Sequence, residues 1–356
     1  MLNGEKSTMY TENKKEKLRL SWLYCDCRYI AIWLLVVILL STALGVALYF
    51  LVIAKEPYKG PPFLPTTLRP LSYNVTLRLL ATYDSGRSDY DGAVTIELIC
   101  LNSTDRIYIH KGDNIRIGRV SLKSVDGDAP DVDSIRHDGQ TDITTIKLSD
   151  FLATNRTYLL QITSFNGQMS TDSSQPGLQL FQYRTTLGQT RFGATFATEE
   201  AGLRHVFPSF DSADFPSVFN MVIVRASTLR SITNAKRDIT VKKSEDFLED
   251  HYFATPKLVP ADLAIVLCDF QYIRLQQAGL QIDVFFRPEI IANISVSADR
   301  MVQFADKRMT EMGKLDAVAV PGLKARFDKP GLSLIPEKQA LEDAAAIAEL
   351  LRRREG

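Results

Sequence analysis

Apolar and polar residues alternate along much of this chain. In residues 71–79, LSYNVTLRL, every second side chain is apolar, and a period of two is typical of a strand with one buried face. Similar runs follow: GAVTIELICL, DRIYIHK, NIRIGRVSL, DITTIKL, RTYLLQITSF, FNMVIVRAS, LAIVLCDFQYI and GLQIDVFFRP. Turn-forming clusters such as YDSGRSDYDG and DGDAPD separate them. Many short strands with such turns predict an antiparallel, sandwich-like β domain, which we place at residues 66–275.

The period becomes helical further along the chain. Residues 295–313, SVSADRMVQFADKRMTEMG, carry apolar side chains on one helical face, with Ser297 as N-cap and Gly313 as the stop. The segment PEKQALEDAAAIAELLRRREG predicts a second amphipathic helix, with Pro336 in its first turn. We therefore interpret residues 276–356 as the start of a second, α-containing domain.

One stretch near the N-terminus is apolar all round. Residues 29–54 carry no charge, and a helix of this length rises about 39 Å, enough to span a bilayer. Basic residues are denser before it than after it, so the positive-inside rule keeps residues 1–28 in the cytoplasm. The span is then an uncleaved signal-anchor, followed by an extended Pro-rich stalk at residues 55–65. These features predict a single-pass type II protein of the plasma membrane, with its C-terminal ectodomain extracellular or luminal.

Composition excludes some classes of function and assigns none. The 356 residues carry 42 basic and 42 acidic side chains, so no charge excess points to nucleic acid. The four cysteines are too few for a disulfide scaffold. Cys25 and Cys27 flank the inner membrane face, either palmitoylated or as free thiols. Cys100 and Cys268 either pair in an oxidising compartment or stay as separate buried thiols, and the sequence leaves this choice and the oligomeric state open.

Asn-x-Ser/Thr sequons occur at Asn74, Asn102, Asn155 and Asn293, all beyond the apolar stretch. This distribution agrees with a glycosylated ectodomain, although so short a motif also recurs by chance. Asn74 lies inside a predicted strand, so glycosylation there requires a side chain that faces solvent.

The histidines are too scattered for a local metal motif. They are His110, His137, His205 and His251, and the sequence contains no H-E-x-x-H, no G-x-S-x-G and no phosphate loop. A zinc site needs at least three well-placed ligands, so we predict no metal site and no cofactor. Within LRHVFP, we expect His205 to be a partly buried, hydrogen-bonded residue and not a catalytic base.

Residues 202–220, GLRHVFPSFDSADFPSVFN, resemble the A-R-x-x-F-P-C-F-D-E-P-x-x-K-A-x-F signature of membrane zinc aminopeptidases of the aminopeptidase N type. Ser209 replaces the family's Cys, and Ser212 replaces its Glu. FLPTTLRPLSYNVTLRL is similar to the family's opening L-P-x-x-L-x-P-x-x-Y-x-L, and GKLDAVAVPGL to its P-K-L-D-x-V-A-V-P-D-F. The resemblance covers residues 60–341. It implies an N-terminal β saddle followed by a thermolysin-like catalytic domain.

In that family, a G-A-M-E-N loop binds the substrate's amino group through its Glu, and H-E-x-x-H with a downstream Glu holds the zinc. In VPGLKARFDKPGL, the alignment puts Asp328 at the amine-binding Glu and Lys329 at the Asn. Glu199 is the nearest counterpart of the segment with the specificity glutamine. In AIAELLRRREG, Ala348 and Arg352 would fall at the two His positions. The resemblance therefore implies two vestigial substrate-binding residues, Asp328 and Glu199, with no catalytic residue and no zinc ligand.

We therefore expect a non-catalytic homologue that binds peptides or proteins outside the cell and contacts the bilayer through residues 29–54. As given, the chain is not expected to be an enzyme. The alternative is a truncated form of an active zinc metalloaminopeptidase, which releases N-terminal amino acids from peptides. A relic without a strong function is a third interpretation. Divergence of both the loop and the zinc motif favours the loss of catalysis.

Overall fold

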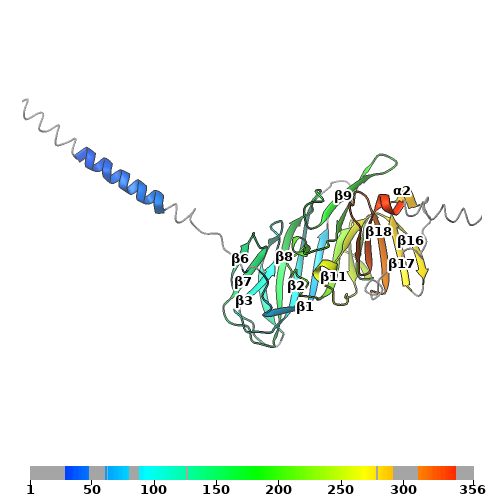
Figure 1. Ribbon diagram of the computed structural model, residues 1–356, viewed down its shortest axis with the longest axis horizontal. Coiled ribbons are helices and arrows are strands. Elements are labelled where there is room, and N and C mark those ends of the chain that lie inside the picture. Colours follow the sequence, from blue (N-terminus) through cyan, green and yellow to red (C-terminus); the bar gives the residue numbers. More distant parts are fainter. Residues whose placement is uncertain are drawn as a thin grey trace, which may run out of the picture. The chain divides into compact units, whose positions relative to one another are not determined.

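The computed structural model describes residues 29–47, 61, 63–79, 88–125, 127–277, 280–291 and 312–341. The chain divides into two compact units, Met1–Pro57 and Tyr58–Gly356. In the first unit, a helix runs over Tyr29–Ala47 (blue in Figure 1). It is long and apolar enough to cross a membrane. The predicted span continues to residue 54, and its last part lies outside the described residues.

In the described part of the second unit, strands are the main regular elements (Figure 1). In chain order the strands are β1 (Leu68–Leu79), β2 (Asp89–Cys100), β3 (Arg106–His110), β4 (Arg116–Ile117), β5 (Val120–Ser124), β6 (Val132–Asp138), β7 (Ile143–Leu148), β8 (Thr157–Gln168), β9 (Gln179–Arg184), β10 (Thr190–Phe196), β11 (Val218–Ala226), β12 (Arg230–Thr233), β13 (Arg237–Lys242), β14 (Phe247–Tyr252), β15 (Ile265–Cys268), β16 (Gln271–Gln277), β17 (Leu280–Phe286), β18 (Lys314–Val320), β19 (Phe327–Lys329) and β20 (Leu332–Pro336). Short helical segments are η2 (Leu203–His205), η3 (Pro260–Asp262) and α2 (Pro288–Ile291). The mainly β architecture that the period-two pattern predicts is confirmed.

The largest sheet among the described residues has eight strands in the order β13-β14-β11-β1-β2-β8-β4, with β5 also paired to β8. Its central strand, β1, runs antiparallel to β2 and parallel to β11. Side chains of β1 alternate as the sequence predicts, with Tyr73, Val75 and Leu77 buried. Tyr73 stacks on Phe219 of β11 with ring centroids 4.9 Å apart. A smaller sheet, β3-β7-β6, contributes to the same core.

The four-stranded sheet β12-β15-β10-β9 is buried on both faces. In β15, Ile265 and Leu267 belong to the core shared with the eight-stranded sheet. Between them, Val266 and Cys268 belong to a second core, shared with the five-stranded sheet. A strand with two buried faces is a continuous apolar run, as in LAIVLC, and not an alternating one. The three sheets therefore stack as layers with this one in the middle.

Cys100 and Cys268 are free thiols, both buried. They lie in different hydrophobic cores, and burial raises the pKa of Cys268 to about 12. The interpretation as separate buried thiols is therefore confirmed, and the disulfide alternative is wrong for this structure.

The third layer is the five-stranded sheet β16-β17-β18-β20-β19, in which β17, β18 and β20 run parallel. Figure 1 shows β16 to β18, in yellow to orange, at the opposite end of this unit from β3, β6 and β7. Pro336 is the last residue of β20, paired with Val320, and the helix begins at residue 337. The prediction that Pro336 lies in the first turn of the helix is therefore wrong by one position. A proline, which has no backbone N–H, is tolerated at the end of a strand as well as at the start of a helix. Most of the predicted helix 295–313 lies outside the described residues.

Three of the four sequons are within the described residues. Asn74 in β1, Asn102 and Asn155 are all exposed, and Asn155 has a positive φ of 60° in a turn. Asn293 lies outside the described residues. Solvent-facing positions are what glycosylation requires, and glycosylation itself stays a prediction.

Asn234 joins the second and third layers. Its side chain is fully buried, and its Nδ2 donates to the carbonyl oxygens of Asp262 and Pro330 over 2.8 Å each. Its Oδ1 accepts from the backbone N–H of Ala264 over 2.7 Å. Pro330 lies in the turn between β19 and β20, so this amide fixes the β19–β20 hairpin against β15.

We expect Asn234→Ala to lower the free energy of unfolding by about 3 kcal/mol, because the backbone N–H of Ala264 and the carbonyl oxygens of Asp262 and Pro330 lose the bonds that they form with this amide. The measurement is urea unfolding of the full chain in detergent. The control is Asn220→Ala, whose amide bonds only to Asn74 at the surface and should cost less than about 1 kcal/mol. Equal losses in the two variants would contradict this account of Asn234.

Candidate functional site

Residues 203–211 form a largely buried turn that is closed by an ion pair. Arg204 Nε donates to Asp211 Oδ2 over 2.8 Å, and Arg204 Nη2 donates to the Asp211 carbonyl oxygen over 3.0 Å. The backbone N–H of Phe210 donates to the Tyr73 hydroxyl over 3.0 Å. Asp211 is only 1% exposed. The residues that carry the family signature therefore anchor this turn to β1, which is a structural role.

Two histidines flank this turn. His110 pairs with Ser209 as an isolated bridge, and burial, with the nearby Arg204 charge, lowers the pKa of His110 to about 3. His205 is half-buried, with its Nδ1 3.1 Å from Asn114 Oδ1. Burial also lowers the pKa of His205. The prediction of a hydrogen-bonded, partly buried His205 is confirmed.

Asp113, His137 and Asp142 bring three possible metal ligands within 4.8 Å of one another. The sequence gives no signal for this grouping, because its members come from separate loops and β6. His137 Nε2 lies 2.9 Å from Asp113 Oδ1, and Arg204 Nη1 lies 3.8 Å from Asp142 Oδ2. The other His137 nitrogen, Nδ1, lies 3.0 Å from a threonine hydroxyl. With both imidazole nitrogens occupied and a guanidinium beside one carboxylate, these residues fit an ion-pair network and do not fit a zinc site.

A groove runs between β9–β10 and the loop after β18. It comprises two adjoining cavities of about 360 and 490 Å³. We call it the loop groove; it is bordered by residues 171–179, by residues 192–199 and by residues 320–327. Sequence reasoning indicated Glu199 in the second of these segments and the loop that contains the third, and it gave no signal for residues 171–179.

The lining of the loop groove is mixed apolar and polar. Both cavities share Thr195 and Leu323. The Oγ1 of Thr195 is buried and has no hydrogen-bond partner among the described residues. A buried hydroxyl without a partner is costly, and a bound polar group would satisfy it. Lys324 adds a positive charge at the junction of the cavities.

Asp328 lies on β19 next to Phe327, which lines the loop groove, and its carboxylate is already occupied. Arg326 Nε lies 2.9 Å from both Asp328 oxygens. The Arg326 side chain is 19% exposed and the Asp328 side chain 34% exposed. The carboxylate that the alignment puts at the amine-binding position is thus paired within its own loop.

Glu199 lies across the groove from β19. Its Oε2 is 3.8 Å from Lys329 Nζ, and its side chain is 68% exposed. Lys329 itself is 4% exposed. The fold therefore brings Glu199 into the lining of the groove, close to the strand that carries Asp328, and each carboxylate faces a cation of the β19 loop.

Comparison with known proteins gives both a family and relatives. The Peptidase M1 N-terminal domain matches residues 69–263. Human aminopeptidase N is 30% identical over 240 residues, which are 64% of this chain and 24% of that protein. The human thyrotropin-releasing hormone-degrading ectoenzyme is 26% identical over 291 residues, 78% of this chain and 26% of that protein. Human aminopeptidase Q is 24% identical over 329 residues, 80% of this chain and 32% of that protein. The chain spans about a quarter to a third of the length of these curated relatives.

Removing the carboxylate of Asp211 should strongly destabilise the fold. We expect Asp211→Ala to lower the free energy of unfolding by about 3 kcal/mol, because the largely buried Arg204 charge then keeps only the longer pair with Asp142, at 3.8 Å. Thermal unfolding of the full chain measures the loss. Asp214→Ala is the control, since Asp214 is an exposed acid on the same segment. A loss below about 1 kcal/mol for Asp211→Ala would contradict the role assigned to the ion pair.

Stability should depend on pH through His110. The unfolded chain takes up a proton at this ring near pH 6.5, while the folded chain does so only near pH 3. The free energy of unfolding therefore falls as the pH decreases through this window. In His110→Gln, urea unfolding across the same pH range should show a shallower fall. His251→Gln, at a partly exposed ring on β14, should keep the fall, and a fall that is unchanged in His110→Gln would argue against the prediction.

Proposed function

This chain belongs to the Peptidase M1 N-terminal domain family, and we propose that it is a membrane-anchored, non-catalytic homologue of aminopeptidase N that binds peptides in the loop groove. The proposal adds three features that remain to be tested: a type II orientation, N-glycosylation and a location at the plasma membrane. It assigns the ectodomain an extracellular peptide or protein ligand. Its substrate-binding residues are vestigial, and it employs no metal.

The Arg326–Asp328 ion pair is the observation that carries the proposal. A carboxylate that binds a peptide's ammonium group must be free to accept its hydrogen bonds. Here both oxygens of Asp328 lie 2.9 Å from one guanidinium nitrogen. The other carboxylate, Glu199, lies 3.8 Å from the Lys329 ammonium group. This positive charge would repel the ammonium group of a peptide N-terminus at Glu199. The groove is therefore poorly suited to recognising a free N-terminus, which an aminopeptidase requires.

The groove still offers what a peptide needs. It presents apolar surface from the half-buried side chains of Leu323 and Phe327. Beneath this surface lies the buried Thr195 hydroxyl, which has no hydrogen-bond partner among the described residues. Concave sites with apolar walls and a few polar groups are the usual ligand sites of proteins. A peptide segment without a free amino group fits this lining better than a substrate of an aminopeptidase.

The anchor and the orientation rest on separate observations. The helix Tyr29–Ala47 is long and apolar enough to cross a membrane. The basic residues before it favour a cytoplasmic N-terminus. The exposed sequons at Asn74, Asn102 and Asn155 favour the secretory side for the β unit.

The alternative is a chain that forms part of an active zinc metalloaminopeptidase. The matched part of the chain covers only 24% of human aminopeptidase N. Most of that relative therefore lies outside the matched region. A glutamate base, a zinc ion and water would supply the chemistry. Reading the gene downstream of codon 356 separates the two proposals, because an in-frame H-E-x-x-H supports the enzyme.

The binding proposal predicts a specific response to the N-terminus of a ligand. The full chain in nanodiscs is titrated with a fluorescein-labelled heptapeptide in two forms, with a free amino group and N-acetylated. We expect the two forms to bind equally, because Arg326 occupies Asp328. Arg326→Gln frees the carboxylate and should strengthen binding of the free-amine form alone by about five- to tenfold, or about 1.0–1.4 kcal/mol.

Leu323→Asp should weaken both peptide forms, and Ile239→Asp, at an exposed apolar residue of β13, should leave both unchanged. Alanine p-nitroanilide tests turnover in the same preparation. Hydrolysis that depends on added zinc, or wild-type preference for the free amino group, would overturn the non-catalytic proposal.

A further inference from the structure

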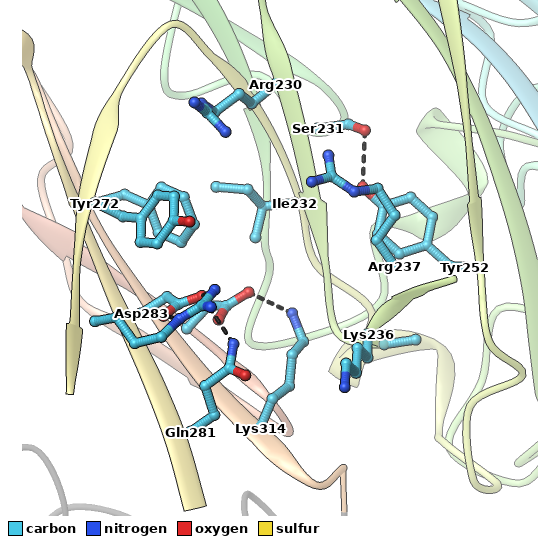
Figure 2. A pocket seen from close by; sticks show the side chains of 14 residues that line it. Arg230, Ser231, Ile232, Lys236, Arg237, Tyr252, Tyr272, Gln281, Asp283 and Lys314 are labelled. Carbon is cyan, nitrogen blue, oxygen red and sulfur yellow. Dashed lines mark hydrogen bonds and ion pairs between the residues drawn. The ribbon is translucent and has the colours of Figure 1, made fainter. Parts of the chain in front are cut away.

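A second cavity, unrelated to the loop groove, lies where β12 and β13 face the five-stranded sheet. We call it the cation pocket; its volume is about 180 Å³. Figure 2 shows its lining, with Arg230, Ser231 and Arg237 on one side and Tyr272 and Asp283 on the other. Its basic side chains come from both sides: Arg230, Lys236, Arg237, Arg274 and Lys314.

Two of these cations are neutralised inside the five-stranded sheet. Arg274 forms a two-pronged ion pair with Asp283, with Nε–Oδ1 and Nη2–Oδ2 distances of 2.8 Å each. Lys314 Nζ lies 2.5 Å from Asp316 Oδ2. Asp283 and Asp316 are therefore each paired with a cation of their own sheet. Neither carboxylate compensates the positive charges of Arg230, Lys236 and Arg237 across the cavity.

Arg237 has only a distant carboxylate. Its Nη1 lies 3.7 Å from Asp250 Oδ2. Arg225, buried behind it, holds both Asp250 oxygens at 2.5 and 3.0 Å. Two hydroxyls, those of Ser231 and Thr240, also donate to this carboxylate, at 2.5 and 2.6 Å. The charge of Asp250 is thus compensated by Arg225, and that of Arg237 is largely uncompensated.

Arg230 and Lys236 have no carboxylate within ion-pair distance in the part of the chain that the structure describes. Arg230 instead lies over the ring of Tyr272, with its Cζ 5.7 Å from the centroid, and Arg274 lies 5.1 Å from the same ring. Three like charges around one concavity repel one another unless an anion is present. The floor beneath them is apolar, with Ile232 and Phe285 in the lining.

We propose that the cation pocket binds a tetrahedral oxyanion, a phosphate or sulfate group, held by Arg230, Lys236 and Arg237. Guanidinium and ammonium groups are the usual partners of such anions, and arginine donates to them in pairs. A doubly charged anion would offset most of the excess charge that these three residues create. Tyr272 borders the cavity and is 38% exposed, so an organic group attached to the anion would contact the part of its ring that Arg230 and Arg274 leave open.

Titration of the full chain in nanodiscs tests the proposal, with binding followed by phosphorus NMR for inorganic phosphate and by calorimetry for inorganic sulfate. We expect saturable binding at constant ionic strength, and none with acetate or chloride. The double variant Arg230→Gln/Lys236→Gln should bind at least about tenfold more weakly, or about 1.4 kcal/mol. Arg237→Gln should also weaken binding, since Asp250 keeps Arg225 as its partner.

The matched control is Arg116→Gln/Lys257→Gln, which removes two exposed cations outside the pocket and changes the net charge equally. It should bind phosphate like the wild type. Phenyl phosphate distinguishes the sources of the anion: tighter binding than inorganic phosphate assigns the pocket to an ester, and equal binding assigns it to the free anion. Binding of acetate as tight as that of phosphate, no saturation, or equal loss in the control variant would overturn the proposal.

Discussion

The four-stranded sheet β12-β15-β10-β9 must bury both of its faces, and the arrangement of the other sheets depends on this constraint. Leu267 and Val266 are neighbours in β15, yet they belong to two different cores. Fully burying each such side chain contributes about 1.5–3 kcal/mol to stability. Leu267 loses this contribution if the eight-stranded sheet moves away, and Val266 loses it if the five-stranded sheet does. The middle sheet therefore needs the eight-stranded sheet on one face and the five-stranded sheet on the other.

This stacking explains where the two candidate sites lie. In the middle sheet, β12 and β9 are the opposite edges. The cation pocket is at the β12 edge and the loop groove is at the β9 and β10 edge, each completed by the five-stranded sheet. Stacked sheets fill the space between them at their centres. Beyond an edge strand of the middle sheet, part of the neighbouring sheet stays uncovered, and a cavity can form there. Asn234 holds the two layers in register through Asp262 and Pro330.

Charge distinguishes structural positions from candidate binding positions. Arg204 with Asp211 and Arg225 with Asp250 are buried pairs, and each fixes a turn or a strand. A buried charge must have a partner, because its desolvation is otherwise uncompensated. In the cation pocket, Arg230, Lys236 and Arg237 are exposed, and among the described residues only Arg237 has a carboxylate within 4 Å, at 3.7 Å. Hydration stabilises such exposed charges in the free protein. In the loop groove the situation is reversed, since Arg326 already satisfies Asp328.

The long apolar helix near the N-terminus, most long strands of the eight-stranded sheet and the family follow from the sequence alone, because each is encoded in a local period or an ordered set of motifs. The sequence also pointed to Asp328 and Glu199. Strands such as β10 and β18 escaped it, since each pairs with a strand remote in sequence, β10 with β15 and β18 with β17. Only the tertiary structure decided that Arg326 occupies Asp328, that Cys100 and Cys268 lie in separate cores, and that Arg230, Lys236 and Arg237 surround one cavity. These facts depend on distances between residues remote in sequence, which no local pattern records.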